Sequence, residues 1–187
     1  ILSQTGVLVR ETERLRQLEM ADTVVLHPSA LCTPGGGVDP WAEPLLDAAR
    51  RAGLRVVMAD DPALADFTGL TDQVEPAGRP LSEVVDRLHD EDRTVVTVTR
   101  PGSADDTGAL TGLLAGDVAV ALADGDGTVV WGADVLALHG PEDVWRLLTA
   151  VPAARKVGRR SQTLARSGAA LSGLLVAVGE SRRGQRT

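Results

Sequence analysis

The sequence is poor in aromatic residues and in cysteine, and each shortage excludes a class of function. Aromatic side chains make up 2% of the 187 residues, with no tyrosine and one phenylalanine. Stacking platforms for single-stranded nucleic acid are therefore missing, and the net charge of −7 argues against binding a phosphate backbone. The single cysteine, Cys32, excludes an intrachain disulfide and a zinc site built from several cysteines. We expect no nucleic-acid partner.

Long apolar runs are also missing, and the basic residues gather near the C-terminus. The run AALSGLLVAVG at 169–179 is shorter than the roughly 20 residues that span a bilayer. We predict that residues 156–187 form a basic C-terminal helix and tail that approaches a membrane surface or docks on a partner domain. A solvated helix face is the simpler alternative. The basic residues near the C-terminus are Arg155, Lys156, Arg159, Arg160, Arg166, Arg182, Arg183 and Arg186.

Short apolar runs alternate with stretches of helical periodicity along the chain. Strands are predicted at 23–26, 55–59, 73–75, 94–99, 117–122 and 134–138. Runs such as TVVL and RVVMA are apolar throughout, as strands buried on both faces should be. This pattern predicts an α/β fold in three layers, with a parallel central sheet covered by helices. In such folds the functional crevice lies beyond the carboxyl ends of the strands.

Ionisable side chains follow three of the predicted strands. His27 ends the first strand, and as a nucleophile or base it would need a carboxylate partner. The pair Asp60 and Asp61 follows the second, and the pair Asp105 and Asp106 follows the run 94–99. Converging carboxylates hold divalent cations such as Mg²⁺, but they also cap helices, and a strand-end histidine can hydrogen-bond within the fold. Both interpretations stay open at this point.

Four stretches follow one another along nearly the whole chain, beginning with GVLVRETERLRQLEMADTVVL. This first stretch resembles the segment that leads from the fourth membrane helix of P-type cation-transporting ATPases into their phosphorylation domain. VDPWAEPLLDAARRAGLRVVMADDPALA resembles the stretch that ends in the Thr-Gly-Asp motif. RTVVTVTRPGSADDTGALTGLLAGDVAVAL resembles the Gly-Asp-Gly-X-Asn-Asp hinge region, and GADVLALHGPEDVWRLLTAVPAARKVGRRSQTLARSGAALSGLL resembles the exit helix toward the fifth membrane span.

The resemblance implies a fold and a domain division. The family's phosphorylation domain has the haloacid-dehalogenase-like fold, a Rossmann-type α/β fold with a parallel central sheet, here followed by a long C-terminal helix. Residues 1–155 would form this domain. The nucleotide-binding domain, which the family inserts after the phosphorylated motif, is reduced to residues 34–38, so the resemblance implies no nucleotide-binding residue. The family's activity is ATP hydrolysis coupled to cation transport.

The positions that carry the family's chemistry are changed in this sequence. The phosphorylated aspartate of the family's Asp-Lys-Thr motif falls on His27, and the threonine falls on Ser29. The threonine of Thr-Gly-Asp falls near Asp60, and the first aspartate of the hinge motif falls on Gly102. Aspartyl-phosphate chemistry needs a carboxylate nucleophile and nearby cations. The resemblance therefore implies no intact catalytic residue.

Two acidic residues of the hinge region remain as candidate metal ligands. The family's asparagine falls on Asp105, and only the last aspartate, Asp106, is kept. We therefore expect no resident cofactor, and Mg²⁺ is the one ion that these residues would suit.

The function expected from these departures is that of a catalytically inactive domain. It would have a structural or regulatory role at the cytoplasmic face of the membrane, within a larger cation-transporting ATPase. The chain looks most like the inactive half of double-length actinobacterial P-type ATPases. One alternative is a Mg²⁺-dependent phosphotransferase or phosphatase that uses His27 with the acidic residues. Another is a metal-binding module built from His27, Cys32 and the acidic pairs.

Overall fold

A mostly parallel sheet forms the centre of the protein in the computed structural model, which describes residues 7–10, 12–102, 107–123 and 129–159. The chain divides into two compact units, Ile1–Val151 and Pro152–Thr187. Within the described residues the first unit holds the sheet and its helices, and residues 152–159 of the second are helical. No helix among them is both long enough and apolar enough to cross a membrane.

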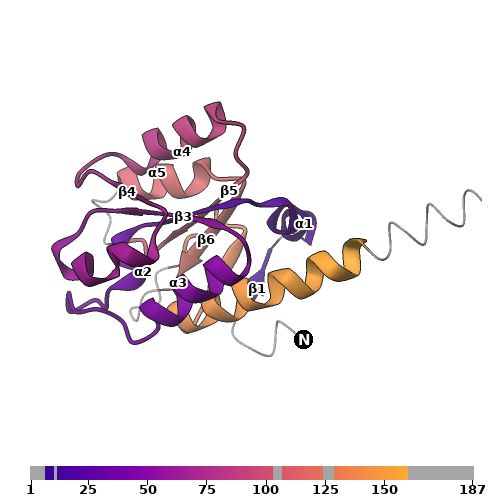
Figure 1. Ribbon diagram of the computed structural model, residues 1–187, viewed down its shortest axis with the longest axis horizontal. Coiled ribbons are helices and arrows are strands. Elements are labelled where there is room, and N and C mark those ends of the chain that lie inside the picture. Colours follow the sequence, from indigo (N-terminus) through magenta and orange to yellow (C-terminus); the bar gives the residue numbers. More distant parts are fainter. Residues whose placement is uncertain (1–6, 11, 103–106, 124–128, 160–187) are drawn as a thin grey trace, which may run out of the picture. The chain divides into compact units, whose positions relative to one another are not determined.

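Seven strands of the described residues form one sheet in the order β1-β7-β6-β5-β2-β3-β4 (Figure 1). Neighbouring strands run parallel except for β1 and β7, which pair antiparallel. The predicted parallel sheet is therefore confirmed. Strand β1 was not predicted, because its three residues are too few to show a periodicity. The strands are β1 (Val7–Val9), β2 (Thr23–Leu26), β3 (Arg55–Ala59), β4 (Gln73–Glu75), β5 (Val95–Thr99), β6 (Val118–Leu122) and β7 (Val135–Ala137).

Helices cover both faces of this sheet. Figure 1 shows α4 and α5 on one face, with α3 on the other. The helices are α1 (Thr12–Met20), α2 (Pro28–Leu31), α3 (Ala42–Arg51), the 3-10 helix η2 (Pro62–Leu70), α4 (Leu81–Asp90), α5 (Thr107–Ala115) and, at the end of the first unit, residues 141–151. The three-layer prediction is confirmed.

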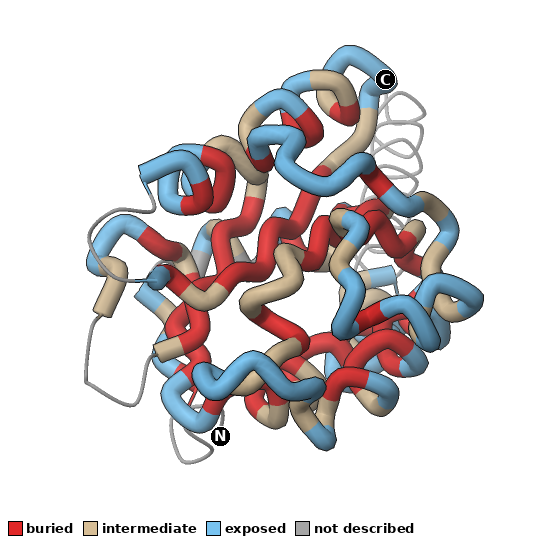
Figure 2. The backbone as a smooth tube through the Cα atoms, turned by 90° about the vertical axis from the view of Figure 1, so that its left-hand side faces the viewer, coloured by how far each residue is buried: buried red, intermediate tan, exposed pale blue. Residues whose placement is uncertain are grey.

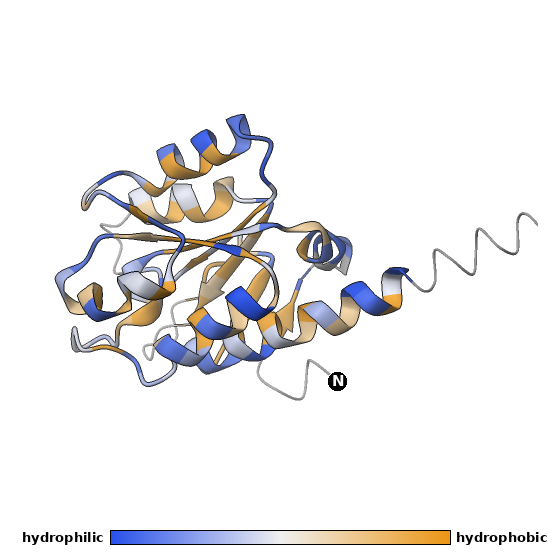
Figure 3. Cartoon of the chain, in the orientation of Figure 1, coloured by the Kyte–Doolittle hydropathy of each residue, from blue (hydrophilic) through white to orange (hydrophobic). Residues whose placement is uncertain are grey.

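Alternate residues of each strand pack on opposite faces of the sheet. In β2, Val24 and Leu26 join the cluster that includes α1 and α3, whereas Val25 joins the cluster of α4. All four residues of β2 are buried, and the strands form the buried, hydrophobic centre in Figures 2 and 3. Burial on both faces explains why the parallel strands read as continuous apolar runs instead of alternating with polar residues.

The helix boundaries follow local signals in one case and tertiary packing in another. Gly53 lies just beyond Ala52, the C-cap of α3, with a positive φ of 71°, a conformation that costs glycine little. Helix α4 begins at Leu81 with Pro80 as its N-cap, and no side-chain hydrogen bond caps it. At Gly112 of α5, an added Cβ would lie 2.4 Å from the Leu81 Cβ. This close approach holds the start of α4 against α5.

Aspartates close the amino ends of the strands. Asp72, Asp117 and Asp134 each immediately precede a strand, and each carboxylate accepts the backbone N–H of a residue in the neighbouring strand. The bonded donors are Val56 at 2.7 Å, Val95 at 2.7 Å and Ala119 at 2.9 Å, in that order. These bonds satisfy N–H groups that lie beyond the regular ladder, where a missing partner would cost free energy.

Candidate functional site

A pocket of about 680 Å³ opens at the carboxyl ends of β2, β3 and β4. Loop 76–80 and the first turns of α4 and α5 complete its wall. From β2 the chain proceeds outward to β3 and β4, whereas β5, β6 and β7 lie on the other side of β2. The order of the strands therefore reverses beside this pocket, which is the place where open α/β sheets hold their ligands.

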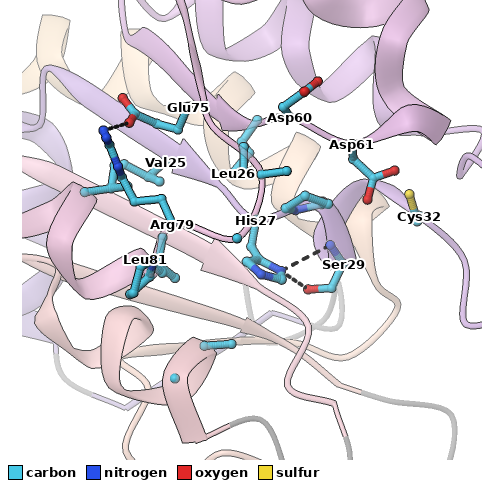
Figure 4. A pocket seen from close by; sticks show the side chains of 18 of the residues that line it. Val25, Leu26, His27, Ser29, Cys32, Asp60, Asp61, Glu75, Arg79 and Leu81 are labelled. Atoms are coloured by element: carbon cyan, nitrogen blue, oxygen red, sulfur yellow. Dashed lines mark hydrogen bonds and ion pairs between the residues drawn. The ribbon is translucent and has the colours of Figure 1, made fainter.

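His27 lies in the pocket as the N-cap of α2 (Figure 4). Its ring Nδ1 accepts a hydrogen bond from the Ser29 N–H at 3.3 Å and lies 2.8 Å from the Ser29 hydroxyl oxygen. The histidine therefore fills the capping role that a short polar side chain usually has at a helix start.

The Ser29 hydroxyl is the centre of a network between the ends of β2 and β5. It lies 3.1 Å from the Thr99 hydroxyl and 3.0 Å from the Arg100 carbonyl oxygen, and it accepts from the Arg100 N–H at 3.1 Å. The Arg100 side chain returns to the same residue, because its Nε donates to the Ser29 carbonyl oxygen at 3.2 Å. A serine hydroxyl has one proton and two lone pairs, so these contacts use its bonding capacity within the protein.

The two carboxylates after β3 differ in what they contact. Asp61 caps η2, since its Oδ1 accepts from the Ala63 N–H at 2.8 Å, so the capping interpretation is confirmed for this residue. Asp60 is exposed, and it is tied to the fold by its backbone N–H, which donates to the Glu75 carbonyl at 2.7 Å. Neither carboxylate forms an ion pair with another described residue.

Glu75, at the end of β4, is a buried carboxylate whose charge is balanced. It is 2% exposed, its Oε2 lies 2.8 Å from Nη1 of Arg79, and its Oε1 contacts Arg87 Nη2 and the Gln73 amide. A buried charge is tolerated when partners and hydrogen bonds offset its desolvation. In the view of Figure 4, Glu75 and Arg79 lie on one side of His27, and Asp61 lies on the other.

The pKa of the Cys32 thiol depends on burial and on the charged side chains at this end of the sheet. Partial burial raises the pKa of its thiol, the negative charges of Asp61 and Asp39 raise it further, and the positive charge of Arg100 acts in the opposite direction. A thiol with a raised pKa is a weaker nucleophile and metal ligand near neutral pH, because the thiolate is the reactive form.

The chain between Cys32 and Asp39 closes in a tight turn. The Thr33 N–H donates to the Gly37 carbonyl at 2.7 Å, and the Gly36 N–H donates to the Thr33 carbonyl at 2.9 Å. Cys32 and Val38 face each other as an isolated antiparallel bridge. The Asp39 N–H then donates to the Leu31 carbonyl at 2.9 Å. The segment 33–38 is therefore held by its own hydrogen bonds.

The structure brings together three of the four positions to which the resemblance assigns the family's motif residues. His27, Ser29 and Asp60 line the pocket, whereas Gly102 is exposed and is not part of the lining. The candidate metal ligands Asp105 and Asp106 lie outside the described residues. Within those residues, no group of three or more His, Cys, Asp or Glu side chains is placed to hold a metal ion.

Sequence reasoning did not identify Glu75 or Thr99 as part of the site. Glu75 is the last residue of a three-residue strand, a position that carries no motif of its own. Thr99 is buried in β5 and contacts Ser29 only because β2 and β5 are neighbours in the sheet. The one available signal was the position of each residue at the carboxyl end of a strand, where ligand sites gather.

Known structures share this architecture. The catalytic CPx-ATPase domain CopB-B superposes with a TM-score of 0.63 at 10% identity, over 80% of this chain and 96% of that one. A protein of Streptomyces avermitilis assigned to the HAD family of hydrolases gives a TM-score of 0.53 at 16% identity, over 77% and 88% of the two chains. The fold is therefore the haloacid-dehalogenase-like α/β fold, as the resemblance implied.

Relatives at the sequence level narrow this class. A probable cation-transporting ATPase I of Mycobacterium tuberculosis is 36% identical over 149 residues, and one of Mycobacterium leprae is 35% identical over 145 residues. These matches cover 78% and 76% of this chain, but the chain spans only 9% of the length of either relative. No family model matches the sequence. The chain belongs to the P-type ATPases, as a domain of haloacid-dehalogenase-like fold.

Proposed function

We propose that this chain is a non-catalytic P-type ATPase domain with a structural or regulatory role in a larger cation-transporting membrane ATPase. The observation that carries the proposal is the network around Ser29. At the crevice where a phosphoryl group would be handled, the hydroxyl is engaged by His27, Thr99 and Arg100. The polar groups there join two strands to each other, which is a structural use of the site.

The residue at the nucleophile position supports the same proposal. His27 replaces the carboxylate that the family phosphorylates, and its Nδ1 faces the Ser29 N–H and hydroxyl. A histidine nucleophile would need its attacking nitrogen directed at the phosphorus and a cation to offset the developing charge. The Lys of the family's motif is Pro28, whose ring begins α2.

A divalent cation would meet an unfavourable charge at one place in this crevice, between the ends of β2 and β5. The Arg100 guanidinium lies at the end of β5, with its Nε 3.2 Å from the Ser29 carbonyl oxygen. A cation placed between the ends of β2 and β5 would be repelled by this permanent positive charge. The proposal therefore includes no step that depends on Mg²⁺.

The closed turn at 33–38 supports the absence of a nucleotide-binding domain. The ends of that segment are joined by the bridge between Cys32 and Val38, so it forms a short connection between α2 and α3. The proposed division of the chain is a phosphorylation-type domain at 1–155 and a basic segment at 156–187, with the nucleotide-binding insertion reduced to 34–38.

The proposed location is the cytoplasmic face of the cell membrane, as part of a longer protein. The relatives are named as cation-transporting ATPases, and this chain matches a small part of them. The partners would be other domains of that protein, and the basic segment 156–187 would reach the anionic membrane surface.

Cosedimentation with vesicles of phosphatidylserine and phosphatidylcholine tests the contact between segment 156–187 and the membrane surface. We expect the chain to cosediment with these vesicles, and binding that is unchanged after replacement of Lys156 and Arg159 by glutamine would contradict a contact through these two residues.

A phosphorylation assay tests the loss of catalysis. The 187-residue chain is incubated with Mg²⁺ and ATP labelled at the γ-phosphate, and the protein-bound label is measured before and after acid treatment. We expect no label above that of the heat-denatured chain, and no release of phosphate above the buffer rate. His27→Ala should behave like the unchanged chain.

The opposite outcome would favour a working phosphotransferase. Incorporated label that is lost in His27→Ala but kept in His139→Ala would contradict the proposal. His139 is a suitable control because its side chain is 64% exposed and it does not line the pocket. Label that depends on Mg²⁺ and on Asp60 would point to the same alternative.

A further inference from the structure

We propose that the pocket binds a small organic cation, an ammonium group carried on an apolar body. The inference extends the proposed function by naming a ligand class for the pocket, and it rests on that function only in assuming that no phosphoryl group occupies the crevice. Its basis is the combination of three features. The wall of the pocket is apolar, the charged side chains that line it are mostly acidic, and the Ser29 hydroxyl, which could bind a phosphate, is already hydrogen-bonded within the protein.

The wall of the pocket is largely apolar. Val25 and Leu26 of β2, Leu81 and Val84 of α4 and Ala109 of α5 all line it, and all five are buried. The volume of about 680 Å³ falls within the range of pockets that hold small molecules. Apolar surface of this kind favours a ligand with a hydrocarbon body, because burying it removes apolar area from water.

The charged side chains at the rim of the pocket favour a positively charged ligand. Four ionised side chains line the pocket, three acidic and one basic. Glu75 is paired with Arg79 and with Arg87, which does not line the pocket. Asp60 and Asp61 are left without an ion pair among the residues that the structure describes. The potential that a ligand meets on that side is therefore negative. Asp61 also adds to the raised pKa of the Cys32 thiol, whose largest cause is partial burial.

Anionic ligands and bare metal ions fit the pocket less well. The Ser29 hydroxyl, which could bind a phosphate, is engaged within the protein, and the Arg100 guanidinium is directed at Ser29 and does not line the pocket. One oxygen of Asp61 already accepts the Ala63 N–H. An ammonium group needs fewer fixed ligands than a metal ion, and its hydrocarbon body uses the apolar wall.

A titration with matched six-carbon probes tests the proposal. The chain labelled with ¹⁵N is titrated separately with hexylammonium, hexan-1-ol and hexanoate, and the amide shifts of pocket residues such as Ala77 and Leu81 are followed by NMR. We expect hexylammonium to bind at the pocket about tenfold more tightly than hexan-1-ol, and hexanoate more weakly than either. Butylammonium should bind about tenfold more weakly than hexylammonium, since each methylene is worth about a factor of three to four.

Charge-neutral variants identify the residues responsible. The double variant Asp60→Asn, Asp61→Asn keeps the shape and the cap acceptor, and should reduce hexylammonium to the affinity of hexan-1-ol. Asp66→Asn is the matched control, because Asp66 is an exposed aspartate of η2 that does not line the pocket. It should leave the affinity unchanged.

Several results would overturn the inference. Hexanoate that binds as tightly as hexylammonium, or more tightly, would be one such result. A second is an affinity for hexylammonium that falls as much in Asp66→Asn as in the double variant. Amide shifts confined to residues outside the pocket, or no binding of any probe, would also overturn it. Inorganic phosphate that shifts the same amides would favour an anion site. These titrations measure binding without ATP, so a failure of hexylammonium to bind is independent of the phosphorylation assay. Label on His27 in that assay would refute the proposed function without deciding the ligand class of the pocket.

Discussion

Aspartates lie at both edges of the central sheet, but their carboxylates have different partners. At the amino edge, Asp72, Asp117 and Asp134 each accept a backbone N–H from the neighbouring strand. At the carboxyl edge, Asp61 caps a helix with one oxygen, and Asp60 reaches the rim of the pocket without an ion pair among the described residues. The same residue type therefore stabilises the fold at one edge and shapes a pocket at the other.

The difference follows from what each edge must satisfy. At the amino edge, N–H groups of buried strands extend past the ladder, and a carboxylate is a strong acceptor for them. At the carboxyl edge, the strands run into loops that diverge around the pocket, so the side chains there can face a ligand. Adjacency to a strand is therefore not enough to mark an aspartate as functional.

The largest expected effect is at the amino edge. Asp117→Ala removes the acceptor for the Val95 N–H at 2.7 Å and for His89 Nε2 at 3.0 Å. We expect the free energy of unfolding to fall by about 2–3 kcal/mol, because hydrogen bonds to charged acceptors contribute about 1.5–3 kcal/mol. Urea denaturation followed by circular dichroism measures this loss. Asp117→Asn keeps an oxygen acceptor and should recover part of it.

The matching change at the pocket rim should cost little. Asp60→Ala removes an exposed side chain with no ion pair to another described residue, so the free energy of unfolding should change by less than about 0.5 kcal/mol. The same denaturation experiment gives the comparison. An equal loss for Asp60→Ala and Asp117→Ala would remove the distinction between the two edges.

Glu75 lies at the carboxyl edge, but its replacement should lower the free energy of unfolding, as at the amino edge. Glu75→Ala leaves Arg79, Arg87 and Gln73 without their shared acceptor. We expect a loss of about 1–2 kcal/mol, less than for a fully buried pair, because the two arginine side chains are 42% and 36% exposed and water can solvate them. Thermal unfolding of Glu75→Ala beside Glu75→Gln separates the lost charge from the lost side chain.

The smallest expected effect is on the chemistry of Cys32. Because the pKa of its thiol is raised above the ordinary value of 9.0, the rate of alkylation by iodoacetamide should keep rising with pH beyond 9. Asp61→Asn removes a negative charge, favours the thiolate and should speed alkylation at pH 8. Arg100→Ala removes a positive charge and should slow it. Changes of the same sign in both variants would contradict this account of the charges.

Much of the fold could be predicted from the sequence because the strand signals are local. The apolar run at 55–59 coincides with β3, and the run at 94–99 differs from β5 by one residue. β1 was missed because three apolar residues carry no period, and its pairing with β7 joins distant parts of the chain. The start of α4 lies against Gly112 of α5, a contact between separate segments that no local pattern predicts.

The candidate site could be predicted only in part. His27 and Asp60 were placed at strand ends by the sequence, and both line the pocket. The link from Ser29 to Thr99 and Arg100 joins residues about 70 positions apart, and it forms because β2 and β5 become neighbours. No local pattern contains that information.

What the sequence determined by itself is the α/β architecture, since period and apolar composition act within each segment. What only the tertiary structure decided is the role of each polar group. Whether an aspartate caps a helix, closes a strand or borders a pocket depends on which backbone groups and charges the fold brings near it. Hydrogen bonds and ion pairs are short-range, so their partners are decided after the chain has packed.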